Sequence, residues 1–146
     1  MLSDEVHPVG SSEYMLSSSR DATFEEVLHF VHGFGIQLSL LDMQDSIISA
    51  MNSAIENEIY SPLNDLPSED YDEEYLAMGL ECYFGIWSHD PNGDGYSGDQ
   101  EYSFISRLDM EVGDPELFRV IKGFFGEKLD YTVFLNSEFE YFSRQF

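Results

Sequence analysis

Basic residues are scarce in this sequence, which contains 6 Lys and Arg against 29 Asp and Glu and has a formal net charge of −23. Between Arg20 and Arg107 there is no Lys or Arg. An electrostatic field of this sign repels nucleic-acid backbones and anionic membranes and attracts cations. The sequence therefore predicts neither a nucleic-acid nor a membrane partner. Two explanations of the acidity stay open, namely solubility in a salty or secreted environment and the binding of several divalent cations.

Cysteines and long apolar runs are also lacking. Cys82 is the only cysteine and lies in the segment LECYFGIW, which excludes a disulfide framework and predicts a small buried hydrophobic side chain. No segment approaches the roughly 18 consecutive apolar residues of a membrane span. The first residues, MLSDEVHPVGSSEYM, do not show the basic and then apolar pattern of a signal peptide. We expect the chain to be a module of a longer secreted protein whose targeting signal lies elsewhere.

Apolar residues are plentiful, since hydrophobic residues make up 42% and aromatic residues 15% of the 146 positions. This composition and length suit one domain with a sizeable core. Residues 1–20 are rich in serine, which predicts an N-terminal arm followed by a single domain over residues 21–146. The segment YTVFL, residues 131–135, is compatible with a strand, and the residues after it with a helix or an extended arm. The predicted fold class is therefore mainly α, either all-α or α+β.

Five helices explain the periodicity of the apolar residues in the predicted domain. The first begins with a capping box at Thr23 and ends at Gly33 and Gly35. The fifth begins at Asp114, a capping residue, with Pro115 at the first helical position. The other three helices are predicted at residues 40–59, 71–88 and 99–109.

The segment DPNGDGYSGDQE, residues 90–101, matches the calcium-loop pattern D-x-[DN]-x-[DN]-G-x5-E at each required position. A calcium ion takes about six to eight oxygen ligands from a loop that coils around it. The predicted ligands are the side chains of Asp90, Asn92, Asp94 and Glu101 and the backbone carbonyl of Tyr96. A helix is predicted on each side, as a helix–loop–helix hand requires. The alternative is a turn rich in Asp, Asn and Gly that caps two helices without a metal.

One narrow edge of the first helix carries Glu25, His29 and His32, with Glu26 beside them. The other faces of the segment TFEEVLHFVHGF carry apolar residues, which predicts that they are buried. The polar edge is then either the solvated strip of a buried helix or one wall of a functional site. His32 joins such a site only if the helix ends in a wider turn.

The segment EEVLHFVHG resembles the active-site helix of the zincin metallopeptidases, which read H-E-x-x-H. The resemblance implies that Glu26 is the general base and His29 a zinc ligand, with Glu25 in the place of the first histidine. The segment EEYLAMGLECYF is similar to a later helix of lethal-factor-type zincins and implies that Glu74 is the third ligand. The resemblance spans residues 23–125 and implies a zincin-like fold and zinc-dependent hydrolysis of peptide bonds.

Departures from the zincin pattern argue against full activity. The carboxylate of Glu25 is a harder ligand than imidazole, so a site of Glu25, His29 and Glu74 favours zinc less strongly over manganese or calcium. Met78 stands where the family's helix has a carboxylate. Glu81 either supports the site in its place or is a surface charge. The chain also resembles segments of large, secreted, acidic bacterial proteins that carry calcium-binding repeats.

Together these features predict a calcium-binding, metallopeptidase-like domain that is catalytically degenerate and acts as a structural or binding module. The expected cofactor is calcium, with zinc as a further candidate. The expected partners are divalent cations and a peptide or a neighbouring module of a larger protein. Three alternatives stay open: an active zinc-dependent peptidase, a plain calcium-binding helical module, and an acidic mimic of nucleic acid that blocks a basic partner.

Overall fold

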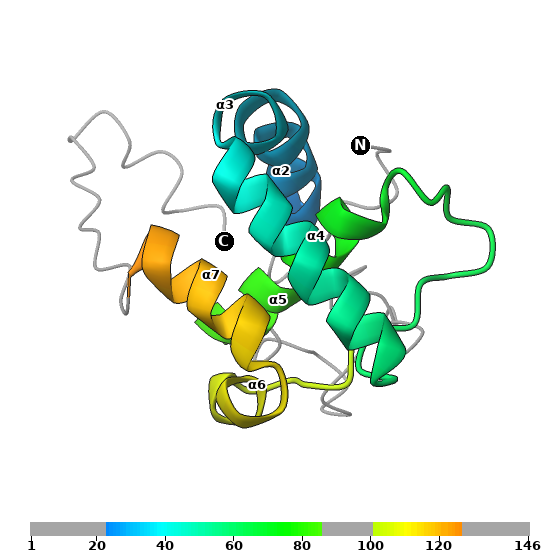
Figure 1. The fold of residues 1–146 in the computed structure, drawn as a ribbon, viewed down its shortest axis with the longest axis vertical. Helices are drawn as coiled ribbons and strands as arrows, with labels where there is room; N and C mark the ends of the chain where they lie inside the picture. The colour runs from blue at the N-terminus through cyan, green and yellow to red at the C-terminus, as the bar shows by residue number, and fades with distance from the viewer. Residues whose placement is uncertain (1–22, 86–100, 127–146) are drawn as a thin grey trace, which may run out of the picture.

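A computed structural model describes two stretches of the chain, residues 23–85 and 101–126 (Figure 1). These stretches are mainly helical and contain no strand, which confirms the predicted fold class, and none of their helices is long and apolar enough to cross a membrane. The predicted arm and the segment YTVFL lie outside them. In chain order the elements are α2 (Thr23–Val31), the π-helix η1 (His32–Ile36), α3 (Gln37–Ser39), α4 (Leu41–Glu56), α5 (Tyr71–Phe84), α6 (Arg107–Gly113) and α7 (Pro115–Phe125).

Helix α5 is the central element and contacts α2, α4, α6 and α7 (Figure 1). Apolar residues occupy nearly all sides of its second half, and every residue from Tyr75 to Tyr83 is buried. Gly79 lets α7 approach closely, because a Cβ atom at this position would lie 2.3 Å from Cδ2 of Leu117. Cys82 is fully buried, as predicted, and burial raises the pKa of its thiol to about 12.

The first helix does not end at Gly33 and Gly35, contrary to the prediction. It continues through them as the π-helix η1 and then as α3, and the chain leaves helical geometry only at Leu40. A π-helix turn is wider than an α-helix turn, and glycine has no Cβ atom to crowd it. The wide turn buries both His32 and Ile36.

Helices α4 and α5 occupy their predicted segments but are shorter. α4 ends at Glu56 instead of residue 59, and Glu58 then has a positive φ of 58°. α5 ends at Phe84 instead of residue 88, because Gly85 adopts the left-handed conformation with a φ of 71°.

The helix predicted at residues 99–109 begins only at Arg107, so the first part of that prediction is wrong. Before α6, Tyr102 forms an antiparallel bridge with Tyr60 and is buried. Ser106 then caps α6 through a side chain that accepts a hydrogen bond from a backbone amide of the first turn. A bridge to a residue far away in the sequence overrides the local helical periodicity here.

Helix α7 begins as predicted, with Asp114 as its cap and Pro115 in the first turn. One carboxylate oxygen of Asp114 accepts a hydrogen bond from the amide of Leu117 at 3.2 Å. The other accepts hydrogen bonds from the hydroxyls of Tyr75 at 2.6 Å and Tyr102 at 3.0 Å. Because Asp114 is buried, these bonds replace the water that its carboxylate loses on folding. They also join α5, α7 and the segment before α6.

Candidate metal centre

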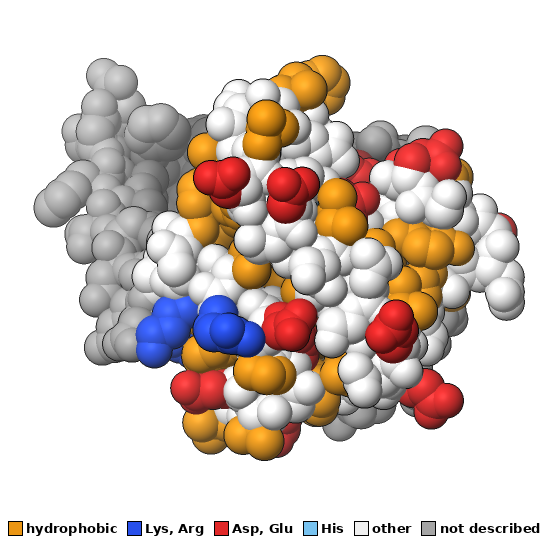
Figure 2. Space-filling view, in the orientation of Figure 1, with side chains coloured by type: hydrophobic (Ala, Val, Ile, Leu, Met, Phe, Trp, Pro, Cys, Tyr) orange, Lys and Arg blue, Asp and Glu red, His pale blue; other side chains and the backbone are white. Residues whose placement is uncertain are grey.

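Helix α2 buries only part of its apolar surface, since Phe24 and Leu28 pack against the core. Its polar edge faces α5, where Nε2 of His29 lies 3.5 Å from Oε2 of Glu74. Large apolar residues such as Phe30 and Phe34 are exposed instead, and Figure 2 shows hydrophobic side chains over α2 and α3. The prediction that the apolar faces of this helix are buried is therefore wrong for its outer face. The polar edge is not simply a solvated strip.

Glu25, His29 and Glu74 form a possible metal-binding group, as predicted. Glu25 and His29 lie one turn apart on α2, and Glu74 comes from the first turn of α5. One ligand atom from each residue lies within 4.8 Å of those of the other two. The side chains of His29 and Glu74 are 21% and 18% exposed, so the group is partly desolvated, and the Nε2 atom of His29 is itself buried.

The separation of His29 and Glu74 suits a shared ion. In a tetrahedral site with bonds of about 2.1 Å, two ligand atoms lie about 3.4 Å apart. The observed distance from Nε2 to Oε2 is 3.5 Å. Two carboxylates and one imidazole supply three donors and leave coordination positions for water or a further ligand. This donor set suits a divalent cation without selecting one, because imidazole favours zinc and carboxylates also suit manganese.

The neighbouring carboxylates change the proton affinity of His29. Burial of the imidazole lowers its pKa, whereas the contact with Glu74 and the attraction of Glu25 and Glu73 raise the pKa. The net effect raises the pKa of His29 above its ordinary value of 6.5. The negative charge that favours a proton on His29 also favours a metal cation between the three residues.

A buried polar network adjoins this group. His32 is 1% exposed, and its Nε2 lies 2.8 Å from Oε1 of Gln44. The side-chain amide of Gln44 donates a hydrogen bond to Oδ2 of Asp72. Asp72 belongs to the same first turn of α5 as Glu74, so the network ties η1 and α4 to the helix end that carries a candidate ligand. His32 belongs to this network and not to the three-residue group.

Sequence reasoning missed Gln44 and Asp72. Gln44 lies on the buried face of α4, three residues before Ile47 and seven before Met51. A polar residue in an apolar stripe is the signal that could have indicated it. Asp72 gives no comparable signal, because it lies in the acidic run SEDYDEE among residues of the same charge.

Glu73 adds a further negative charge at the start of α5. Its Oε2 lies 3.7 Å from Nδ1 of His32. Burial and the charge of Asp70 raise the pKa of Glu73, and the attraction of His29 and His32 offsets this increase only in part. The first turn of α5 therefore concentrates carboxylates where the helix dipole favours negative charge.

The other residues of the zincin resemblance lie on the same two helices. Glu26 follows Glu25 on α2 and is partly buried. Met78 and Glu81 are buried within α5, with 3% and 1% of their surfaces exposed. The alternative that Glu81 is a surface charge is therefore wrong.

The predicted calcium loop lies almost entirely outside the described residues. The residues outside are Asp90, Asn92, Asp94 and Tyr96. The fifth predicted ligand, Glu101, is 9% exposed, and its Oε1 accepts a hydrogen bond from the amide of Leu63 at 3.2 Å. The backbone carbonyl of Glu101 accepts a second hydrogen bond from the amide of Ser61 at 2.7 Å. Glu101 thus holds the segment between α4 and α5 in place.

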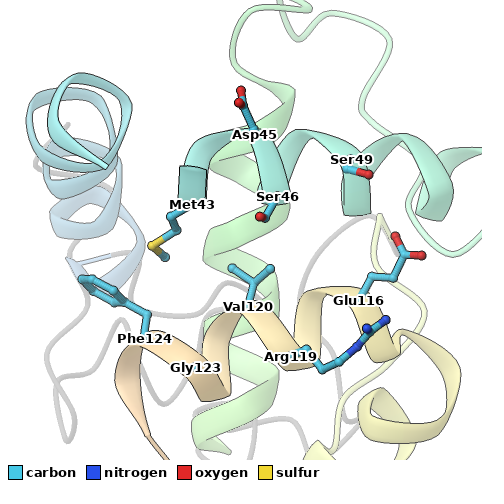
Figure 3. A pocket seen from close by; sticks show the side chains of 9 residues that line it. All are labelled: Met43, Asp45, Ser46, Ser49, Glu116, Arg119, Val120, Gly123 and Phe124. Carbon is cyan, nitrogen blue, oxygen red and sulfur yellow. The ribbon is translucent and has the colours of Figure 1, made fainter. Parts of the chain in front are cut away.

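A groove of about 720 Å³ lies between α4 and α7 (Figure 3). It is lined by Met43, Asp45, Ser46 and Ser49 of α4 and by Glu116, Arg119, Val120, Gly123 and Phe124 of α7. In Figure 3, Met43 and Phe124 lie at one end and Glu116 at the other. The lining includes none of the three candidate ligands, so the groove and the candidate metal centre are separate features.

Comparison with known proteins does not assign the chain to a family. No protein-family model matches it, and no curated protein or solved structure matches it either. The zincin and calcium-hand resemblances therefore stay hypotheses based on short motifs, and any functional proposal depends on the geometry of the chain's own residues.

Proposed function

We propose that this protein is a divalent-metal-binding helical module in which Glu25, His29 and Glu74 hold the ion. The observation that carries the proposal is the convergence of these three donors, from two helices, within 4.8 Å of one another. Zinc is the first candidate, because one imidazole and two carboxylates lie within its usual range of ligands. Manganese is the second, because carboxylates suit it well.

The ion would first have a structural role, because its ligands come from both α2 and α5 and it would link the two helices. Without it, the carboxylates of Glu25, Glu73 and Glu74 lie close to the imidazole of His29, whose pKa they raise. A divalent cation removes part of the repulsion between these carboxylates. Because the ion binds only where both helices are in place, its binding free energy stabilises the folded chain. This role agrees with a catalytically degenerate module of a larger protein.

Zinc-dependent hydrolysis of peptide bonds is the second candidate function. It is favoured by a set of three protein donors, since catalytic zinc sites keep one coordination position open. Zinc would supply Lewis-acid polarisation of the peptide carbonyl and of a water molecule. Glu26, which follows Glu25 on α2, would accept the proton of that water as the general base.

Calcium binding at residues 90–101 is a further part of the proposal. It is supported by the match of the segment to the calcium-loop pattern at each required position. An isolated loop of this kind would bind calcium weakly, in the range of about 10⁻⁴ to 10⁻³ M.

Calorimetric titration of zinc, manganese and calcium into the chelator-treated protein tests the metal centre. We expect one equivalent of zinc to bind to the wild type. His29→Ala and Glu74→Gln should each weaken zinc binding by at least about tenfold, because each removes one of three donors. Glu116→Gln, which alters an exposed carboxylate of α7, is the matched control and should leave the affinity unchanged. Unaltered zinc affinity in His29→Ala would show that the metal is bound elsewhere.

Two further variants separate the calcium and peptidase hypotheses from the zinc hypothesis. Glu101→Gln should weaken calcium binding and leave zinc binding unchanged, since Gln retains an oxygen that accepts the hydrogen bond from Leu63. Glu26→Gln should retain zinc and lose any hydrolysis of fluorogenic peptides that the zinc-loaded wild type shows. If the zinc-loaded wild type hydrolyses no peptide, the structural role remains as the function of the zinc site.

A further inference from the structure

The outer side of α2, η1 and α3 exposes a ridge of large apolar side chains. This ridge, the outer apolar face, consists of Val27, Phe30, Val31, Phe34 and Leu38. Their exposed fractions range from 44% to 70%. Phe30 and Phe34 lie against each other with ring centroids 4.9 Å apart. Single exposed apolar residues are ordinary, but a contiguous ridge of this kind marks an interaction site.

The spacing of these residues favours a helix as the occupant. Neighbouring members of the ridge, such as Phe30 and Phe34 or Phe34 and Leu38, are three or four residues apart along one helical axis. A ridge with this spacing fits between the side-chain rows of a second helix. Recognition of an amphipathic helix by an apolar surface follows the same geometry.

The charges around the outer apolar face determine which helix fits it. Helices α2 to α5 contain no Lys or Arg. Glu26 on α2 and the exposed Asp42 at the start of α4 make this part of the surface acidic. The basic residues of the described stretches are Arg107, Arg119 and Lys122, which belong to α6 and α7. Figure 2 shows the basic side chains of the visible face in one group, away from α2 and α3.

Charge also argues against two other occupants. A second copy of the chain would bring another net charge of −23 to the interface, and like charges oppose such an association. An anionic membrane would be repelled for the same reason. A helix with an apolar stripe flanked by Lys and Arg complements the apolar ridge and also the acidic residues around it.

We propose that the outer apolar face binds a basic amphipathic helix of a partner protein. The apolar stripe of that helix packs on Phe30 and Phe34, and its Lys and Arg side chains lie near Glu26 and Asp42. The interaction does not depend on the metal centre, which occupies the edge of α2 that faces α5.

The test uses the full chain and a fluorescein-labelled 18-residue peptide of Leu and Lys with its leucines on one helical face. A second peptide has the same composition in an order that spreads the leucines around the helix. Fluorescence anisotropy at about 150 mM salt should give at least about tenfold tighter binding of the amphipathic peptide. Equal affinity for the two peptides would overturn the proposal, because it would show only attraction between opposite net charges.

Paired surface variants locate the binding site. Phe30→Gln with Phe34→Gln should weaken binding of the amphipathic peptide by at least about tenfold. Leu108→Gln with Val112→Gln is the matched control, because these residues are also exposed apolar side chains, 75% and 84%, but lie on α6. Circular dichroism verifies that both double variants are folded. Equal weakening in the two double variants, or none in the first, would overturn the proposal.

Two further measurements distinguish the other occupants. Sedimentation velocity should show the same mass for the wild type and for the Phe30/Phe34 double variant. If the wild type is a dimer and the double variant is a monomer, the face mediates self-association and the proposal is overturned. Binding of the wild type to phosphatidylcholine vesicles, lost in the same variant, would overturn it in favour of a lipid surface.

Discussion

The imidazole of His29 lies among the carboxylates of Glu25, Glu73 and Glu74, which raise its pKa in the folded protein. In the unfolded chain the same imidazole titrates near 6.5. Folding therefore favours the protonated form, and this contribution to stability is complete below the unfolded pKa. It is lost as the pH rises through the higher folded pKa. At still higher pH, a metal ion can take the place of the proton.

We predict that the unfolding free energy of the metal-free wild type falls as the pH rises above about 6.5. His29→Asn should flatten this part of the curve, because no imidazole remains to release its proton. Urea denaturation with a chelator at a series of pH values between 6 and 8 measures the effect. Glu116→Gln should keep the wild-type slope. An unchanged slope in His29→Asn would assign the pH dependence to another group.

Local spacing placed two of the candidate ligands on one helix edge, but their roles as ligands followed from the resemblance to zincins. Glu25 and His29 are four residues apart, and residues at this spacing lie on the same edge of a helix. Glu74 comes from a helix that is distant in sequence, so only the resemblance to zincins pointed to it. Gln44 and Asp72 could not be assigned in this way, because their roles depend on hydrogen bonds between separate helices.

Local capping chemistry indicated where α7 begins, but the buried faces of the helices did not follow from the pattern. Asp114 and Pro115 fixed the start of α7 because the capping hydrogen bond and the proline act within one turn. Phe30 was expected in the core and is exposed, because the polar edge of α2 packs on α5 instead. Tyr102 was expected in a helix and pairs with Tyr60, a contact that no local pattern contains.

Replacing Gln44 should show how α4 supports the candidate metal centre. In Gln44→Leu, His32 and Asp72 each lose a hydrogen-bond partner in the interior. We expect the unfolding free energy to fall by about 2 kcal/mol or more, because buried polar groups without partners are costly. Asn52→Leu changes an exposed residue of the same helix and should alter the unfolding free energy by less than about 0.5 kcal/mol. Equal effects in chemical denaturation would contradict the role given to the network.

The contact between α5 and α7 offers a second matched pair. Gly79→Ala would place a Cβ atom 2.3 Å from Cδ2 of the fully buried Leu117, so the unfolding free energy should fall by about 1–3 kcal/mol. A Cβ atom at Gly123 in α7 would meet nothing within 4 Å. Gly123→Ala should therefore raise the unfolding free energy by about 0.5–1 kcal/mol. Thermal denaturation of both variants gives the two values. Stabilisation by Gly79→Ala would mean that the two helices can separate at little cost.

The whole molecule combines a net charge of −23 with a core built around α5. Such a charge keeps proteins apart in solution but also opposes compactness, since like charges repel one another. A bound divalent cation lowers the net charge and joins two helices at the same time. Its effect on stability should therefore exceed that of a salt at equal ionic strength.

We predict that zinc at about 100 times its Kd stabilises the wild type by about 2.7 kcal/mol. For a chain of this size the increase in Tm should be of the order of 10 °C. Sodium chloride at the same ionic strength is the control for charge screening. The shift should be absent in His29→Ala. A similar shift in that variant would indicate zinc binding at other carboxylates.

The π-helix η1 contains one residue more than a regular α-helix would need between α2 and α3. Because this wider turn takes up the extra residue, α2 and α3 keep nearly the relative orientation that one continuous α-helix would give them. Deleting Gly33 should therefore restore an α-helix there and leave Glu25 and His29 directed toward Glu74. In evolutionary terms, the chain can gain or lose a single codon at this turn while the three-residue group is kept.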